Sequence, residues 1–445
     1  MLETEHSSNL PHEVASKPRR WFSRRLAANP LLGSSALFFI STTLVNAGNY
    51  LFNLLLGRWL GPALFADVSI IITLFLFLTF ITAGFQQTAA KFSAIYSADH
   101  APARVFALRR WLNRRSWVIG ALCLLIVGGG APFWQTFFHT TSPWIFVIFA
   151  LGLPVYFVQG IDRGILQGQM RFGALAASYQ AEMWVRLSVG LLLVGLGWAA
   201  HGAVFGLTLS LVATWFVSHR ALRNAQNQLR QTTPFTQPET FAPTEQRALL
   251  SFAFPVLMAE ISLILINNSD VLIVKHFFDG VTAGQYAALA LIGRIVFFAT
   301  WSVVITMFPL VAQKHQRQEA HRPLLWTGLG LVFVVSVVIV LATTLMPRLI
   351  VQLLFGPAYL TIAPLLWLYA VATALFALAN VLINYRLALG NRGGTVFALA
   401  IGIVQVLTLL LLHVTLFQVV LIQIVLMGAL LLLLVGWEIL GHHES

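Results

Sequence analysis

A carboxylate, Asp270, lies within an apolar run from Phe252 to Phe278 that is long enough to cross a lipid bilayer. Roughly 20 apolar residues span the hydrocarbon core, and a charge at its centre costs about 3 kcal/mol on insertion scales. Glu260 and Asn267 precede Asp270 at helical spacing, so the three side chains share one side of the helix. Such a side can hold a proton or a sodium ion, or it can join helices by hydrogen bonds. We predict ion coupling at Asp270 and Glu260, with hydrogen bonding between helices as the alternative.

A polar stripe also follows the first apolar segment, residues 31–56. Five polar residues repeat there at the spacing of one helix face: Ser35, Thr42, Asn46, Asn49 and Asn53. Three asparagines on one face are unusual for a membrane helix. Together with Asn267, we expect Asn46, Asn49 and Asn53 to line a hydrated cavity wall and to bind substrate. Hydrogen bonding between helices is again the alternative.

Three cationic residues accompany these groups. Arg294 lies about seven residues into an apolar segment, 287–312, where an unpaired guanidinium is costly. It is expected to bind a phosphate in bidentate fashion, or to pair with Asp270 or Glu260. Lys275 and Arg58 lie near the predicted outer ends of their segments. They either anchor the helices at the membrane surface or surround the outer mouth of a substrate cavity.

Glu182 and Arg186 form a separate pair in the apolar segment 173–197. Their i, i+4 spacing, with the acid first, favours an ion pair within one helix. The sequence therefore predicts a structural role for this pair. Glu182 is also the third candidate for ion coupling, after Asp270 and Glu260.

The composition is that of a polytopic membrane protein. Hydrophobic residues make up 58% of the 445 residues, charged residues make up 9%, and the mean hydropathy is +0.82. We predict an all-α protein with about twelve transmembrane segments: 31–56, 68–90, 117–138, 144–162, 173–197, 203–219, 250–277, 287–312, 324–346, 361–385, 396–414 and 417–437.

Basic residues predict the orientation of these segments. Of the 27 lysines and arginines, 22 fall before the first segment or in the even-numbered loops, all on one side. Positive charge favours the cytoplasmic side, so we expect a multi-pass protein of the plasma membrane with both termini in the cytoplasm. The net charge of +12 follows from this topology and requires no nucleic acid partner.

A polar, proline-containing stretch divides the chain into two halves of six segments each. The predicted organisation is an N-terminal tail (1–30), a first lobe (31–219), a cytoplasmic linker (220–249), a second lobe (250–437) and a C-terminal tail (438–445). Shifting the second half by 218 residues places Glu260 over Thr42 and Asn267 over Asn49. Two similar halves with a polar site between them are typical of transporters.

Several short stretches resemble the polysaccharide (O-antigen type) flippases of the multidrug/oligosaccharidyl-lipid/polysaccharide exporter superfamily. They occur in the expected order and cover most of the chain. The sequence departs from the family pattern at Ala66, where a glycine usually precedes the second segment. The stretches are LLLGRWLGP (54–62), GILQGQMRFG (164–173), NSDVLIVK (268–275), AGQYAA (283–288), LFGPAYL (354–360) and LALGN (387–391).

The resemblance implies two six-helix lobes around a V-shaped central cavity. It also implies a cargo, an oligosaccharide linked to undecaprenyl pyrophosphate, and alternating access to the two sides of the membrane. Partners would be the lipid bilayer, an H⁺ or Na⁺ coupling ion, and the glycosyltransferases and polymerase of the same pathway.

Other functions remain open from the sequence. A lipid II flippase usually has additional segments, and a multidrug antiporter favours an acidic site, whereas Arg58, Lys275 and Arg294 accompany the carboxylates here. A membrane glycan polymerase or ligase is less favoured, because the predicted outer loops are short and the chain lacks a Walker-type loop and a metal-spaced Cys or His cluster. No cofactor is expected, and a non-transporting scaffold is the remaining alternative.

Overall fold

The computed structural model describes residues 30–232, 241–391 and 393–440. Across these residues the secondary structure is helical, with no strand. Nine helical stretches are long and apolar enough to cross a membrane, and one bent pair of helices adds a tenth. Two of the nine contain a kink that divides them into two segments each, so the described residues hold the twelve expected segments. The predicted all-α polytopic class is confirmed.

The first two segments form one long helical stretch, α2 (Pro30–Ala98), that is kinked at Gly61. Gly61 has a φ of 71°, which a residue with a Cβ adopts only at a cost, and the following Pro62 lacks a backbone donor. Ala66 lies beyond the kink in regular, fully buried helix. The missing glycine at position 66 therefore leaves the second segment helical.

The remaining helices of the first lobe are α3 to α7. A short π-helical turn and a 60° bend separate α3 from α4, which together make the third segment. Gly197, with a φ of 90°, divides the fifth segment from the sixth. The bounds are α3 (Pro102–Leu124), α4 (Ala131–Phe138), α5 (Trp144–Gly168), α6 (Phe172–Leu193) and α7 (Ala199–Thr232).

The second lobe comprises α8 to α15. Asp279 caps α9 by accepting hydrogen bonds from the backbone of Val281 and Thr282, and hydrogen bonds from Thr282 hold the pKa of this carboxyl below its usual value. The bounds are α8 (Pro243–Phe277), α9 (Gly280–Gly293), α10 (Ile295–Gln316), α11 (Arg322–Leu345), α12 (Pro347–Leu354), α13 (Leu366–Ala388), α14 (Gly393–Leu411) and α15 (Leu416–Leu440).

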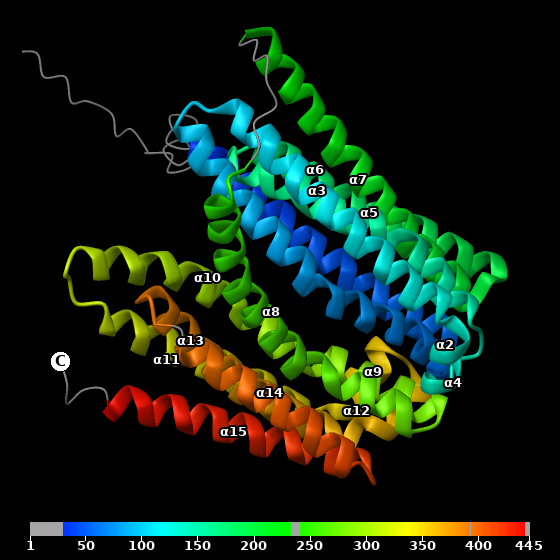
Figure 1. The fold of residues 1–445 in the computed structure, drawn as a ribbon. Helices are drawn as coiled ribbons and strands as arrows, with labels where there is room; N and C mark the ends of the chain where they lie inside the picture. Colours follow the sequence, from blue (N-terminus) through cyan, green and yellow to red (C-terminus); the bar gives the residue numbers. More distant parts are fainter. Residues whose placement is uncertain (1–29, 233–240, 392, 441–445) are drawn as a thin grey trace, which may run out of the picture.

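The two lobes form a V (Figure 1). They meet at the end that contains α4, α9 and α12, and they diverge towards the end that contains the α10–α11 turn. α8 runs from the first lobe at the diverging end to the second lobe at the converging end (Figure 1). The space between the arms is where the sequence places the central cavity.

Helices extend into the stretch expected to be a linker. α7 continues to Thr232 and α8 begins at Pro243, which leaves only 233–240 outside the described residues in this region. Leu222 and Ala225 are buried and prolong the packed face of α7. The tails, 1–29 and 441–445, also lie outside the described residues.

A row of glycines on α5 sets the packing of the first lobe. Gly160, Gly164 and Gly168 follow each other at four-residue spacing against the second half of α2. A Cβ at Gly164 would collide with the backbone oxygen of Gln86. The two helices are therefore in backbone contact, as in small-residue interfaces of membrane helices.

Candidate functional site

A buried cluster of three charges lies in the first lobe. The Glu182 carboxylate accepts from Arg163 Nη2 at 2.8 Å and from Arg186 Nη2 at 2.6 Å. Arg186 Nη1 also donates to Asn49 Oδ1 at 3.2 Å, and Arg163 Nε donates to Ser178 at 3.1 Å. Two guanidinium groups share one carboxylate, so this group, the N-lobe cluster, carries a net charge of +1.

Aromatic rings cover both arginines of the N-lobe cluster. The Arg163 guanidinium lies 3.8 Å from the centre of the Tyr179 ring, and that of Arg186 lies 5.3 Å from the centre of Phe75. Arg186 Nε is buried without a hydrogen-bond partner in the described chain. The cluster thus retains an excess positive charge and a free donor in a low-dielectric environment.

The predicted Glu182–Arg186 pair is present, but its second partner was missed. The sequence places Arg163 just beyond segment 144–162, whereas α5 continues to Gly168 and leaves Arg163 only 5% exposed. The available signal was the glycine spacing from Gly160 to Gly168, which indicates close helix packing beyond the hydropathy boundary.

A second buried cluster surrounds Asp270 in the second lobe. Asp270 Oδ2 accepts from Tyr369 at 2.8 Å, Tyr286 at 2.9 Å and Gln423 at 3.0 Å. Asp270 Oδ1 lies 3.4 Å from Arg294 Nη2. These five residues form the C-lobe cluster, which is neutral overall.

Arg294 pairs with Asp270, which is one of the alternatives that the sequence left open. Besides Asp270 it contacts Asn268 Oδ1 at 3.1 Å, while its Nε is buried without a partner among the described residues. Its side chain is 14% exposed, and its role in substrate binding stays a prediction. The sequence analysis did not single out Tyr286, Tyr369 or Gln423. Tyr369 and Gln423 are polar groups within predicted apolar segments, and Tyr286 directly precedes one.

Glu260 lies apart from Asp270 and contacts the opposite lobe. It accepts a hydrogen bond of 3.0 Å from Gln87 on α2. Asn267, between the two carboxylates in sequence, donates to the backbone oxygen of Leu263. The three groups of the predicted polar side of α8 therefore have three separate sets of partners.

The asparagines of the first segment also lie in different surroundings. Asn49 joins the N-lobe cluster, Asn53 donates to the backbone oxygen of Asn49, and Asn46 is exposed. Arg58 is also exposed. The structure thus brings Asn49 to the charged cluster but leaves Asn46 and Arg58 on the surface.

Lys275 forms a buried ion pair between the lobes, which we call the interlobe lock. Its predicted role at the outer mouth of a substrate cavity stays a prediction. Lys275 Nζ lies 2.9 Å from Asp67 Oδ1, and the two side chains are 2% and 1% exposed. Asp67 Oδ2 accepts from the backbone and the hydroxyl of Thr141, at 2.9 and 2.7 Å. Asp67, which the sequence reading did not single out, joins the lobes at their converging end.

Further contacts close this end. The Tyr359 hydroxyl donates to the backbone oxygen of Gly57 at 2.7 Å, and Phe65 packs against Phe355 and Tyr359. His276 stacks on Phe137, with ring centres 4.1 Å apart. The converging end is therefore sealed by packed rings as well as by the lock.

The first half of α8 packs on the first lobe. Glu245 pairs with Arg104 at 2.9 Å, Phe252 lies edge-on to Phe92, and Phe241, just before α8, stacks on Tyr96. The other half of α8 lies in the second lobe, where Gln405 of α14 donates to the backbone oxygen of Ile266. α8 therefore has partners in both lobes.

Solved membrane transporters share this architecture. An inward-facing multidrug resistance MATE family transporter of the MOP superfamily aligns with a TM-score of 0.73 at 12% identity, over 88% of this chain and 94% of that one. The lipid II flippase MurJ, in an inward closed conformation, gives 0.70 at 13% identity, over 90% and 87%. A MOP superfamily transporter from Pyrococcus furiosus gives 0.59 at 13% identity, over 93% and 96%. At these identities the likeness establishes the fold alone.

Family assignment comes from the sequence. No curated protein matches the chain. The model of the family described as polysaccharide biosynthesis protein matches residues 31–315, which is more than half of the chain and includes the N-lobe cluster, the lock and the Asp270–Arg294 pair. The resemblance noted from the short stretches is confirmed, and the chain belongs to the polysaccharide biosynthesis protein family.

Proposed function

We propose that this protein moves an oligosaccharide linked to undecaprenyl pyrophosphate across the plasma membrane, by alternating access between its two lobes. The observation that carries the proposal is the family match on a fold shared with transporters. The sealed converging end and the diverging arms fit one state of an alternating-access cycle. The protein acts as a transporter and not as an enzyme.

The charge of the N-lobe cluster supports an anionic cargo. Arg186 offers an unpartnered Nε and is the best-placed group for a pyrophosphate, with Asn49 beside it. Arginine binds phosphate in bidentate fashion, and such a contact strengthens away from water. Arg294 is a second contact that becomes available when Asp270 releases it. Asn46, Asn53, Asn267 and Arg58 remain candidates for contacts with the sugars and the lipid head group.

The C-lobe cluster supports coupling to a proton or a sodium ion. Asp270 accepts from four donors, so binding of a cation has to displace Arg294 or reorient the hydroxyls of Tyr286 and Tyr369. An ion that binds one state more tightly than the other biases the cycle. Glu260 is the second candidate, because its partner Gln87 is on the opposite lobe.

Two transport functions of the same superfamily compete with this proposal. The fold is shared with a lipid II flippase and with multidrug transporters at similar TM-scores, so the fold does not choose between them. The net positive charge of the N-lobe cluster favours an anionic cargo over a cationic drug.

Reconstituted vesicles test the proposal. Vesicles are prepared with a radiolabelled polyprenyl-pyrophosphate oligosaccharide in both leaflets, and an impermeant glycosidase is added outside. With the protein, the whole labelled pool is expected to become accessible, whereas protein-free vesicles lose only the outer-leaflet fraction. Parallel vesicles contain lipid II or ethidium. If the protein transports only lipid II or only ethidium, the proposed cargo is wrong and that compound takes its place.

Orientation is tested separately in intact cells. Single cysteines at Thr236 and Thr282 are introduced into a Cys123→Ala background and treated with an impermeant thiol reagent. Thr282, in the first turn of α9, is expected to be labelled, and Thr236, in the segment between α7 and α8, is expected to be protected. Labelling of the cysteine at position 236 from outside the cell would show that the predicted orientation is wrong.

A further inference from the structure

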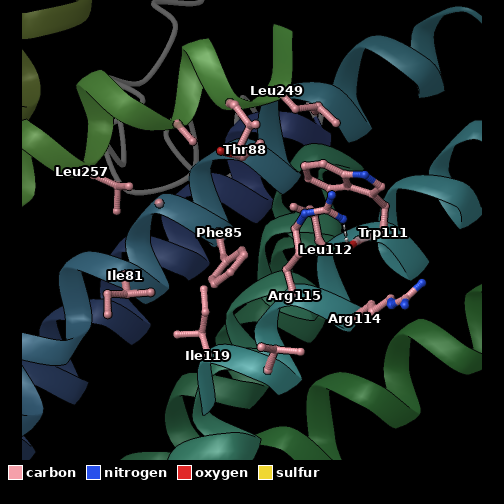
Figure 2. Close-up of a pocket in the computed structure, with 14 residues that line it drawn as sticks. Ile81, Phe85, Thr88, Trp111, Leu112, Arg114, Arg115, Ile119, Leu249 and Leu257 are labelled. Carbon is pink, nitrogen blue, oxygen red and sulfur yellow. Dashed lines mark hydrogen bonds between the residues drawn. The ribbon is translucent and has the colours of Figure 1, made fainter. Parts of the chain in front are cut away.

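A cavity of about 520 Å³ lies beside the interface of the lobes (Figure 2). Its walls come from the second half of α2, from α3 and from the first half of α8. The lining is largely apolar, and Ile81, Phe85, Ile119, Leu249 and Leu257 form much of it. The cavity shares no residue with the N-lobe cluster, the C-lobe cluster or the lock.

The cavity borders the lipid-facing surface. Val118 and Leu250 belong to its lining and are 57% and 56% exposed. In a chain that crosses the membrane repeatedly, large apolar side chains with this exposure face hydrocarbon. A hydrocarbon chain from the bilayer therefore has direct access to the cavity.

Two arginines stand at one side of the cavity. Arg115 lies over the Trp111 ring at 3.4 Å from its centre and donates to the Trp111 backbone oxygen at 3.2 Å. Arg114 is exposed and has neither an ion pair nor a hydrogen bond within the described chain; it extends away from the Trp111 ring (Figure 2). No carboxylate of the described residues pairs with either arginine, so this side carries two uncompensated positive charges.

The position of the arginines places them at the level of lipid head groups. Both lie within three residues of Trp117, where the apolar part of α3 begins. They also lie towards the end of the molecule that the basic residues assign to the cytoplasm. The cytoplasmic leaflet contains the anionic phospholipids that attract such residues.

The wall also contains two hydrogen-bond donors without partners. Thr88 is 2% exposed, and its hydroxyl has no partner among the described residues. The same holds for Trp111 Nε1. Ester oxygens of a diacyl lipid can accept from such donors, whereas a prenyl chain offers no acceptor.

From these features we propose that the cavity binds one acyl chain of an anionic diacyl phospholipid. The phosphate is held by Arg114 and Arg115, and the ester groups lie towards Thr88 and Trp111. Because the walls belong to α2, α3 and the first half of α8, which packs on them, the bound lipid stabilises the conformation in which these helices are together. This site is independent of the cargo, and its failure would leave the proposed transport function untouched.

Lipid retention by the purified full-length protein tests the proposal. The protein is exchanged into detergent with defined phosphatidylglycerol or phosphatidylcholine, and bound lipid is counted by native mass spectrometry. Wild-type protein is expected to retain phosphatidylglycerol preferentially. The R114Q/R115Q variant should bind it roughly thirtyfold more weakly, as expected for the loss of two basic residues near an anionic group. The control R110Q/R317Q, which removes the same charge from exposed arginines outside the cavity, should bind as wild type does.

A second variant tests the cavity itself. Ala253→Phe fills the space while leaving both arginines in place, and it should also reduce retention of phosphatidylglycerol. Equal retention of the two lipids by wild type, or wild-type retention by Ala253→Phe, would overturn the proposal. A polyprenyl phosphate that displaces phosphatidylglycerol from the same arginines would instead assign the cavity to a prenyl lipid.

Discussion

The balance of charge in the N-lobe cluster makes the carboxylate more important for folding than either arginine. Glu182→Gln leaves two buried guanidinium groups beside each other, and breaking such a buried arrangement costs about 3–5 kcal/mol. Arg186→Gln leaves Glu182 paired with Arg163 and should cost less. We therefore expect a large loss of thermal stability for Glu182→Gln, measured by thermal unfolding in detergent, and a small one for Arg186→Gln.

Transport by the same variants separates structure from binding. Arg186→Gln should fold yet move little lipid-linked oligosaccharide, and Arg186→Lys should retain part of the activity because the charge remains without the bidentate geometry. Normal transport by stable Arg186→Gln would remove Arg186 from the cargo site.

A matched pair of variants applies to the C-lobe cluster. Asp270→Asn leaves Arg294 without a charged partner. The amide group of the new side chain also faces the hydroxyl donors of Tyr286 and Tyr369. The substitution should therefore destabilise the protein by about 3–5 kcal/mol. The double variant Asp270→Asn/Arg294→Gln should recover much of this loss in a double-mutant cycle. In vesicles, the double variant should lose its dependence on an imposed ion gradient. It should still bind cargo through Arg186, but more weakly than wild type, because the proposed second contact, Arg294, is missing. Unchanged gradient dependence would move coupling to Glu260, and next to Glu182.

At the level of single residues, the sequence identified charges but not all of their partners. Asp270 and Glu182 were recognisable because a carboxylate in an apolar segment needs compensation. Asp67 was not, because it precedes its segment by one residue and reads as a loop residue. Its partner Lys275 is 208 positions away, and no local periodicity connects the two.

At the level of the helices, the close contact between α2 and α5 leads to a specific prediction. Gly164→Ala places a Cβ against the Gln86 backbone and should cost about 1–3 kcal/mol, as overpacking usually does. Gly330→Ala, in α11, is the control, because no atom lies within 4 Å of its added Cβ. Thermal unfolding of the two variants should show a loss for the first and none for the second. Equal unfolding temperatures would show that the α2–α5 contact relaxes without cost.

Hydropathy predicted the twelve segments but not where the helices end. α5 continues beyond its predicted segment to Gly168 because its end packs against α2. α7 also continues beyond its predicted segment and stays packed on the first lobe as far as Ala225. Burial by neighbouring helices, which decides these ends, depends on tertiary contacts that a single-sequence pattern does not contain. The pairing of α8 with the first lobe was unpredicted for the same reason.

For the whole molecule, alternating access requires the converging end to open. Cysteines at Phe137 and His276, whose rings are stacked 4.1 Å apart, can be joined by a short bifunctional maleimide in a Cys123→Ala background. The joined protein is expected to stop transporting lipid-linked oligosaccharide in vesicles. Each single-cysteine variant, treated with the same reagent, serves as the control and should remain active. Full transport by the joined protein would mean that the lobes do not separate at this end.

The placement of α8 also bears on how the protein is assembled during synthesis. Domains generally fold in the order in which the ribosome makes them. The partners of the first half of α8, which include Arg104 and Phe92, belong to the part of the chain already made when α8 emerges. Docking of this half therefore requires nothing that follows it. A nascent chain that ends after α8 therefore already has the surface against which the remaining helices, α9 to α15, pack.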